Sequence, residues 1–380
     1  MTSLRTLFFV LPFILAAQPK DVTVTVRNPL DIERNGEIVS VDLGAIRHLR
    51  PEWKGVTLEV MDGRTALVSQ SIDNDADGID DEIIFPARIA PRGKRSYSLR
   101  PGPRREHPSP VDVRYVLPRQ DIGWENDRIA FRVYGSVLAG NVDNGIDVWT
   151  KRVAYPVVAK WYKESEGSLP GKDTYHQDRG EGADFFSVGR SLGAGSAGLL
   201  YNGRLVQPGL FDHHRVIGNG PLRVSFELYY TDAVIDTHRF TLVKRITLDA
   251  GSQLNRIDER YVSNASFAAE LAAGLVKRAN TVPAAVPSDG VLALWGPTNA
   301  DSVNGFLGTG VVLPASGTLR EDSTQVLITM PVEFGRSISY LSGAAWSRRG
   351  GITSAAEWSS LLASASRRLR HPLIVTVSSR

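Results

Sequence analysis

Histidine, tyrosine and arginine side chains gather in the middle of this sequence, between residues 120 and 231. His176 lies in the polar, glycine-bounded segment TYHQDRGEG, and His213 and His214 form a pair further along the chain. A neutral imidazole accepts a proton near neutral pH, and loops often carry catalytic groups. We therefore expect His176 and His213 to act as acid–base groups, with His214 at the substrate. A surface or capping role is the alternative for each histidine.

The segment from Trp124 to Tyr134 alternates apolar and polar residues, which predicts a strand. Arg132 and Tyr134 are two residues apart, so they share one face of that strand. Trp stacks on sugar rings, Arg pairs bidentately with a carboxylate, and a Tyr hydroxyl can transfer a proton. This combination suits a sugar acid, with Tyr134 as a catalytic group. The alternative is the solvent-facing side of an edge strand.

Other charged residues extend the predicted site. Arg223 and Glu227 share a strand face by the same alternation, although routine cross-strand ion pairing is an equal alternative. Lys151 adds a positive charge. The predicted substrate-binding residues are Trp124, Glu125, Arg132, Lys151, Arg179, His214, Arg223 and Glu227.

The run DNDADGIDDE, which starts at Asp73, places carboxylates at alternate positions before a glycine. This pattern is typical of loops that wrap oxygen ligands around calcium. A complete EF-hand loop needs an acidic residue at its twelfth position, where this chain has Ile84. The helical calcium hand is therefore excluded. Two interpretations stay open: a solvated acidic turn, or a shorter structural calcium site formed by Asp73, Asp75, Asp77 and Asp81. No other cofactor is expected.

Short runs of β-branched and aromatic residues recur between turn signals, for example at 21–27, 96–100, 222–230 and 239–248. This rhythm predicts an all-β protein. Proline cannot donate to a strand ladder, so the Pro- and Arg-rich segment 100–110 predicts a loop and a domain boundary. We predict a small N-terminal β-rich domain at residues 18–104 and a large antiparallel β-sandwich at residues 105–380.

Two local patterns refine this prediction. Ser354 and Glu357 form a capping-box pattern ahead of an apolar stripe, which predicts one C-terminal helix, followed by a closing strand at 373–377. The glycine-rich segment 189–198 lacks the lysine and the helix of a phosphate-binding loop, so we interpret it as a flexible turn.

Composition excludes several classes of protein. The net charge is +3 without any block of basic residues, so no nucleic-acid partner is expected. Because the chain has no cysteine, disulfides and thiolate chemistry are excluded. The apolar run from Leu7 to Ala17 is shorter than a membrane span of roughly 20 residues and is typical of a signal peptide. We expect a signal peptide at residues 1–17, no membrane span, and a periplasmic or secreted protein. The oligomeric state stays open.

Several motifs resemble an exported bacterial family described as domain of unknown function 4861. They are the D-x-D-x-D-G run at 73–85, the W-E-N block at 124–134, D-V-W-T-K at 147–151 and G-P-L-R at 220–223. The similarity covers nearly all of the chain after the signal peptide. The association of this family with polysaccharide utilisation implies an acidic oligosaccharide or polysaccharide as the partner. The organisation also resembles the supersandwich of galactose mutarotase-like proteins, by analogy alone.

The first hypothesis is a lyase that cleaves a uronic-acid glycan by β-elimination. Such an enzyme must neutralise the carboxylate, remove the neighbouring proton and protonate the departing oxygen. We expect His176 or His213 to be the base and Tyr134 to be the acid. The expected cation is one of Arg132, Arg179 and Arg223.

Two alternatives remain. A glycoside hydrolase would use a pair of carboxylates from Glu125, Asp184 and Glu227. A non-catalytic glycan-binding protein would present a stacking platform formed by Trp124, Trp149 and Trp161.

Overall fold

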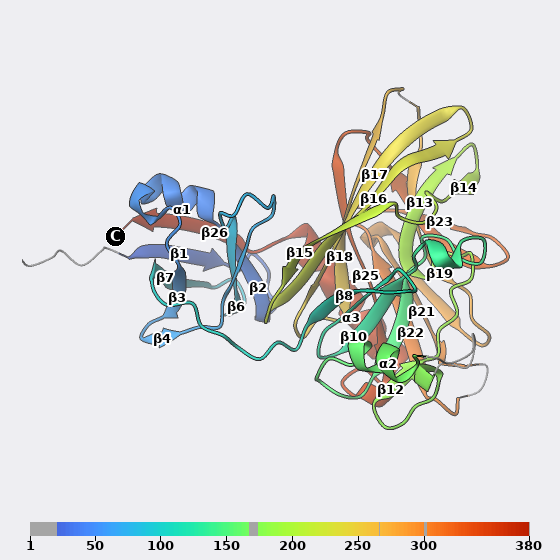
Figure 1. The fold of residues 1–380 in the computed structure, drawn as a ribbon, viewed down its shortest axis with the longest axis horizontal. Coiled ribbons are helices and arrows are strands. Elements are labelled where there is room, and N and C mark those ends of the chain that lie inside the picture. Colours follow the sequence, from blue (N-terminus) through green and yellow to red (C-terminus); the bar gives the residue numbers. More distant parts are fainter. Residues whose placement is uncertain (1–20, 167–173, 266, 300–301, 380) are drawn as a thin grey trace, which may run out of the picture.

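The computed structural model describes residues 21–166, 174–265, 267–299 and 302–379 (Figure 1). The predicted signal peptide at 1–17 lies outside these residues. Most elements in the described ranges are strands, and all paired strands run antiparallel. The predicted all-β class and the large sandwich are confirmed.

The smaller domain consists of two sheets that pack face to face around one apolar core (Figure 1, blue to teal, with β26 in red). Alternate residues of the first strand, Val22, Val24 and Val26, point into this core. One sheet has the order β26 (Ile374–Ser379), β1 (Val22–Arg27), β7 (Lys94–Pro101), β3 (Leu58–Asp62) and β4 (Thr65–Ala66). The other has the order β2 (Arg34–Asp42), β6 (Glu82–Ile89) and β5 (Gln70–Ile72).

The last strand belongs to this smaller domain, which differs from the predicted boundary. The sequence pattern correctly indicates a strand after Pro372, but our predicted boundary places residues 105–380 entirely in the large sandwich. Instead, β26 pairs with β1 along its whole length, from Val22 opposite Ser379 to Arg27 opposite Ile374. Local patterns identify a strand but not its partner, because pairing depends on contacts that are distant in sequence.

The larger domain contains three sheets around a common core. The eight-stranded sheet has the order β15 (His213–Asn219), β16 (Arg223–Ile235), β17 (His238–Asp249), β18 (Leu254–Ser263), β25 (Ser337–Trp346), β22 (Phe306–Val312), β21 (Val291–Pro297) and β20 (Val282–Val286). The facing sheet has the order β14 (Arg204–Val206), β13 (Ala194–Tyr201), β19 (Glu270–Val276), β24 (Gln325–Pro331) and β23 (Thr318–Glu321). The third has the order β12 (Gly182–Asp184), β11 (Asp147–Lys151), β10 (Ile129–Val133), β9 (Asp121–Glu125) and β8 (Asp112–Val116).

The predicted C-terminal helix is α3 (Ala355–Arg370), and its capping box forms as expected between Ser354 and Glu357. Its Trp358 and Leu362 are buried against the eight-stranded sheet. Two short helices were not predicted, α1 (Leu43–Leu49) and α2 (Val158–Glu164). The single helical turns are η1 (Pro51–Trp53), η2 (Ser136–Leu138), η3 (Thr174–His176), η4 (Pro287–Asp289) and η5 (Ser347–Arg349). No helix in the described ranges is long and apolar enough to cross a membrane.

The glycine-rich segment 189–198 is only partly the turn that we predicted, because β13 begins at Ala194. Gly195 has a φ of +105°, and a Cβ there would lie 2.5 Å from the Cβ of Ser342 in β25. Glycine therefore lets the two sheets approach closely at this point.

The two domains make specific contacts. The side-chain carbonyl of Gln70 accepts hydrogen bonds from the backbone N–H groups of Leu222 and Arg223, at 3.0 and 2.9 Å. Leu222 also packs with Ile72 and Ile84 of the smaller domain. The buried, hydrogen-bonded side-chain amide of Gln70 and this apolar cluster together hold the smaller domain against the start of β16.

Candidate functional site

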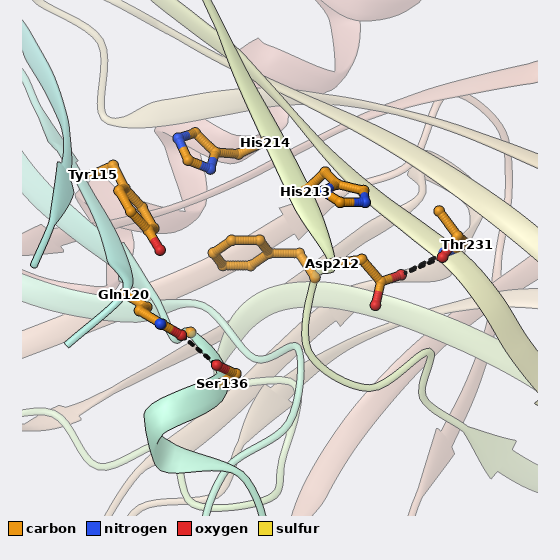
Figure 2. Close-up of a pocket in the computed structure, with 9 residues that line it drawn as sticks. Tyr115, Gln120, Ser136, Asp212, His213, His214 and Thr231 are labelled. Carbon is orange, nitrogen blue, oxygen red and sulfur yellow. Dashed lines mark hydrogen bonds between the residues drawn. The ribbon is translucent and has the colours of Figure 1, made fainter. Parts of the chain in front are cut away.

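A polar cavity of about 440 Å³ lies where β8, β15 and the turn η2 meet (Figure 2). Strands β8 and β15 contribute one wall each. The segments before β9, after β10 and before β15, together with Thr231 of β16, complete the lining. The lining residues are Tyr115, Gln120, Gly135, Ser136, Phe211, Asp212, His213, His214 and Thr231.

Aromatic rings form one side of this cavity. The ring of His214 stacks on the phenol of Tyr115, with centroids 4.3 Å apart and planes at 25°, and Phe211 meets the imidazole edge-on. Partial burial, followed by the nearby His213, lowers the pKa of His214. His214 is therefore neutral at pH 7 and has a ring nitrogen that can accept a proton.

Polar groups form the other side. The Oδ2 atom of Asp212 accepts hydrogen bonds from Thr231 N at 2.7 Å and Thr231 Oγ1 at 2.8 Å. The hydroxyl of Ser136 bonds to Oε1 of Gln120. The amide NH₂ of Gln120 and the exposed imidazole of His213 are donors suited to the hydroxyl or carboxylate oxygens of a ligand.

The two neighbouring histidines lie on opposite faces of β15. His213 is paired with Tyr229, and His214 is paired with Leu228. Successive side chains of a strand point to opposite faces, so an interior strand would separate the two rings. Both reach the cavity because they are the first residues of β15, which is an edge strand.

A second polar cluster brings together three predicted residues, Arg132, Tyr134 and His176. The guanidinium of Arg132 is buried, and its Nη2 donates to Asp147 Oδ2 at 2.6 Å and Asp184 Oδ2 at 3.0 Å. The same group lies 3.4 Å from the Tyr134 hydroxyl. Arg132 and Tyr134 thus share a face, as predicted. The strand lies in the interior of its sheet, and the carboxylates of Asp147 and Asp184 bind the guanidinium of Arg132.

His176 and Tyr134 differ in exposure within this cluster. The Nδ1 atom of His176 is 3.0 Å from the backbone oxygen of Asp184, and its side chain is 43% exposed. Tyr134 is buried, and this burial, followed by the charge of Asp147, raises its pKa well above the ordinary value. Neither residue lines the cavity that contains His213. The predicted acid–base residues therefore divide between the cavity and the Arg132 cluster.

Glu125 and Lys151 form a fully buried ion pair at the start of α2. Lys151 Nζ is 2.5 Å from Glu125 Oε2, and Glu125 also accepts hydrogen bonds from Val157 N and Val158 N. Burial raises the pKa of Glu125 and lowers that of Lys151. Both groups are satisfied by the protein itself, so the geometry gives them a role in holding α2 on the sheet.

The three tryptophans of the proposed stacking platform are buried. Trp124 is inaccessible to solvent and donates from Nε1 to Asn255 Oδ1 at 2.8 Å, while Trp149 and Trp161 are 1% and 4% exposed. The platform prediction is wrong, because these rings fill the core and the contact with α2.

Arg223 and Glu227 adopt the alternative that the sequence left open, cross-strand pairing. Arg223 Nε is 2.6 Å from Asp249 Oδ1 on the neighbouring strand. Glu227 is paired with Arg215 at 3.0 Å and with Arg245 at 2.8 Å. Arg179 is exposed in the loop before β12.

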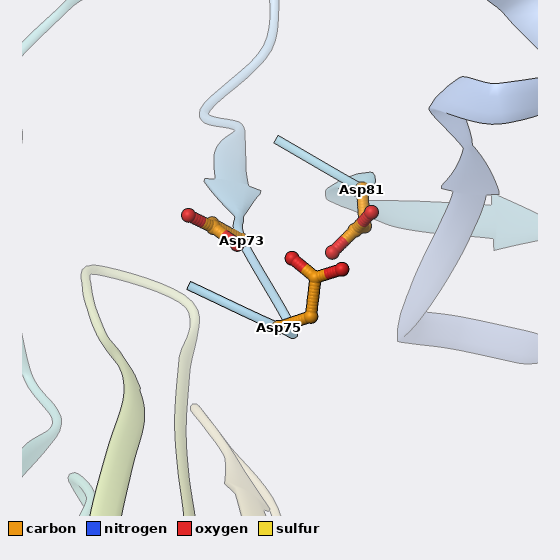
Figure 3. Close-up of side chains that lie close together, drawn as sticks. All are labelled: Asp73, Asp75 and Asp81. Atoms are coloured by element: carbon orange, nitrogen blue, oxygen red, sulfur yellow. The ribbon is translucent and has the colours of Figure 1, made fainter. Parts of the chain in front are cut away.

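Three of the four predicted calcium ligands lie together (Figure 3). Carboxylate oxygens of Asp73, Asp75 and Asp81 lie within 4.8 Å of one another. Asp77 is not part of this group, and its Oδ1 accepts a hydrogen bond from Ile79 N at 2.8 Å. Oxygen ligands of this kind fit a hard cation such as calcium, which stays a prediction.

Seven cavity residues were not predicted: Tyr115, Gln120, Gly135, Ser136, Phe211, Asp212 and Thr231. Phe211 and Asp212 directly precede the histidine pair, so their position in the sequence was a usable signal. The other five come from several parts of the chain and show no local pattern that distinguishes them from ordinary strand and turn residues.

Comparison with known proteins identifies the family. "Uncharacterized protein P7" of Formosa agariphila is 28% identical over 377 residues, which cover 93% of each chain. A solved protein of glycosyl hydrolase family 38 from Enterococcus faecalis has a TM-score of 0.51 at 10% identity, over 95% of this chain and 48% of that one. An α-mannosidase from Enterococcus faecalis V583 gives a TM-score of 0.46 at 9% identity, over 95% of this chain and 46% of that one. This chain spans about half the length of both solved proteins. The sequence profile of the domain of unknown function DUF4861 matches residues 26–375, so the chain belongs to the DUF4861 family.

Proposed function

We propose that this protein is a carbohydrate-active lyase that cleaves uronic-acid glycans by β-elimination in the Tyr115–His214 cavity. The observation that carries the proposal is the stacked pair of a phenol and a neutral imidazole at the wall of a polar cavity. The fold shared with a protein of glycosyl hydrolase family 38 gives additional support for a carbohydrate ligand.

The chemistry needs a base and an acid on the sugar. A nitrogen of His214 removes the proton from the carbon next to the carboxylate, and that electron pair forms the new carbon–carbon double bond. The bond from the adjacent carbon to the glycosidic oxygen breaks, and the Tyr115 hydroxyl donates its proton to the departing oxygen. Tyr115 takes the role predicted for Tyr134, because Tyr134 is buried against Arg132.

The sugar carboxylate must be neutralised during this step. Among the described residues that line the cavity, none is lysine or arginine. The amide NH₂ of Gln120 and a ring N–H of the exposed His213 are donors in the lining that can bind the carboxylate. A glycoside hydrolase is less well supported, because the lining has a single carboxylate, Asp212, and Thr231 already donates to it twice.

Ultraviolet absorbance of the unsaturated product tests the lyase. Wild-type protein should generate this signal from at least one of the pectic, alginate, ulvan and glucuronan oligosaccharides. His214→Ala and Tyr115→Phe should each lower the rate roughly 100-fold or more, since an acid or base is lost. His48→Ala, at an exposed histidine on α1, is the matched control and should leave the rate unchanged. Flat traces for the wild type with all four substrates would reject the lyase.

A non-catalytic glycan-binding protein is the second proposal, supported by the exposed aromatic surface of the cavity. Tyr115 is 37% exposed, and Phe211 lies beside the stacked pair. Calorimetry that detects binding of these oligosaccharides, lost in Tyr115→Ala, without any product would favour this function over the lyase.

We also propose that the protein is exported to the periplasm or secreted, with cleavage after Ala17. The charged residue Arg5 and the apolar run that follows support this proposal. N-terminal sequencing of the protein from a periplasmic fraction would give Gln18 as the first residue. Recovery of the intact chain from the cytoplasm alone would contradict it.

A further inference from the structure

The eight-stranded sheet has an outer face, which we define as the side of β15–β18 that points away from the common core. The core side carries Val224, Phe226 and Leu228 of β16. The strand pairing places two rows of residues across the outer face. One row is His213, Tyr229, Val243 and Arg260, and the next is Arg215, Glu227, Arg245 and Asp258.

The outer face is continuous with the cavity. His213 belongs to the first row and also lines the cavity, so its imidazole stands where the two surfaces meet. A ligand that leaves the cavity past His213 therefore passes onto β16, β17 and β18.

The outer face carries a modest excess of positive charge, and four of its arginines are ion-paired with its own carboxylates. By the same strand alternation, the outer face also carries Arg223 and Asp249, which are paired across β16 and β17, and Arg256 of β18. The guanidinium groups are those of Arg215, Arg223, Arg245, Arg256 and Arg260, and the carboxylates are those of Glu227, Asp249 and Asp258. Guanidinium groups thus outnumber carboxylates, which favours an anionic ligand.

Two of these guanidinium groups already bind oxygen atoms of the smaller domain. Arg215 Nη2 donates to the backbone oxygen of Asn74 at 2.8 Å, and Arg245 Nη1 donates to Asn74 Oδ1 at 3.1 Å. The loop at Asn74 therefore covers one end of the face. The other end reaches solvent. The Arg256 side chain is 54% exposed, although its guanidinium is paired with Asp258 at 3.0 Å, and Arg260 is exposed, with its Nε donating to the backbone oxygen of Gly335 at 3.0 Å.

We propose that the outer face binds the extension of an anionic glycan chain whose reacting unit occupies the cavity. This inference rests on the proposed function of that cavity. Arg260 contacts a sugar carboxylate through its exposed guanidinium, and Arg256 adds positive charge beside it while staying paired with Asp258. The outer face then makes the protein bind long glycan chains more tightly than short ones, while the cavity carries out the cleavage.

The test compares polymers with short oligosaccharides in the double variant Arg256→Gln/Arg260→Gln. Polygalacturonate and alginate, with their tetrasaccharides, are the probes, and calorimetry and turnover are the measurements. We expect the Kd for the bound polymer to rise at least about tenfold at low salt, and the difference to shrink at high salt. Turnover of tetrasaccharides should stay unchanged.

Arg320→Gln is the matched control, since this arginine is 48% exposed but lies on β23 of the facing sheet. It should leave polymer binding unchanged. Arg256→Lys/Arg260→Lys keeps the charge and should retain most of the polymer binding.

Each outcome decides the inference. Unchanged polymer affinity in the glutamine variant, or a wild type that binds neither polymer, would overturn it. If the wild type binds polymer through these arginines but releases no unsaturated product, the lyase proposal fails and the binding face stands.

Discussion

At the scale of single residues, burial separates the predicted site into groups that can meet a ligand and groups that cannot. The histidine pair could be predicted from sequence because FDHHRV concentrates titratable groups in a short segment. The roles of Arg132 and Glu125 could not, because each is satisfied by a partner distant in sequence, and Tyr134 is buried beside Arg132. Residue type indicates the chemistry that a side chain can do, while its partners decide whether it is free to do it.

The pH dependence of turnover is one prediction at this scale. Because the pKa of His214 lies below its ordinary value, the neutral form persists to lower pH and the charged form appears only in acid. Turnover should therefore be level above about pH 7 and fall in acid with a midpoint below about 6.5, the ordinary value for histidine.

His213→Ala tests the cause of that lowered pKa. The charge of His213 is the second contribution to the lowering, after burial. Removing it should shift the acid limb of the turnover profile to higher pH. A limb that moves to lower pH, or stays in place, would contradict the assignment of His214 as the base.

At the scale of elements, the positions of strands could be predicted from the sequence, but the short helix α2 and the contact that holds it could not. The predicted strands at 222–230 and 239–248 correspond to β16 and β17. Helix α2 escaped prediction because it has only seven residues and no side-chain cap of its own. Its first N–H groups are instead satisfied by Glu125 from β9, a contact that no local pattern can indicate.

Substitution of Lys151 measures how much this contact stabilises the fold. Lys151→Met leaves the Glu125 carboxylate buried without its cation, so the free energy of unfolding should fall by about 3–5 kcal/mol. The double variant Glu125→Gln/Lys151→Met should recover a large part of that loss, because no unpaired charge remains. Urea unfolding measures both, and equal losses in the single and double variants would contradict the explanation.

The acidic loop offers a prediction about metal binding. If Asp73, Asp75 and Asp81 hold calcium, the Tm should rise on addition of calcium and fall on addition of a chelator, because a ligand of the folded state stabilises it. Asp75→Asn should abolish the difference, and Asp77→Asn, outside the group, should retain it. An identical Tm with calcium and with chelator would favour the solvated acidic turn.

At the scale of the whole molecule, the fold class was predictable but the division of the chain was not. The predicted boundary at 104 lies in the connection between β7 and β8. The assignment of β26 to the smaller domain depends on pairing across most of the chain, which composition and periodicity do not encode.

Truncation before Ile374 tests the role of this strand. Loss of β26 exposes the edge of β1 and uncovers apolar contacts made by Val375 and Val377. Amide exchange in β1 and β7 should become faster, whereas β16–β18 should keep their protection. Uniform loss of protection across both domains would show instead that they unfold together.

The return of β26 also has a consequence for biogenesis. A ribosome delivers the polypeptide in order, so β1 emerges long before the strand that completes its sheet. The smaller domain must therefore wait, incomplete, until the entire larger domain has been delivered. For the export that we propose, this order of synthesis would keep the leading part of the chain unfolded during passage, because its sheet cannot be completed early.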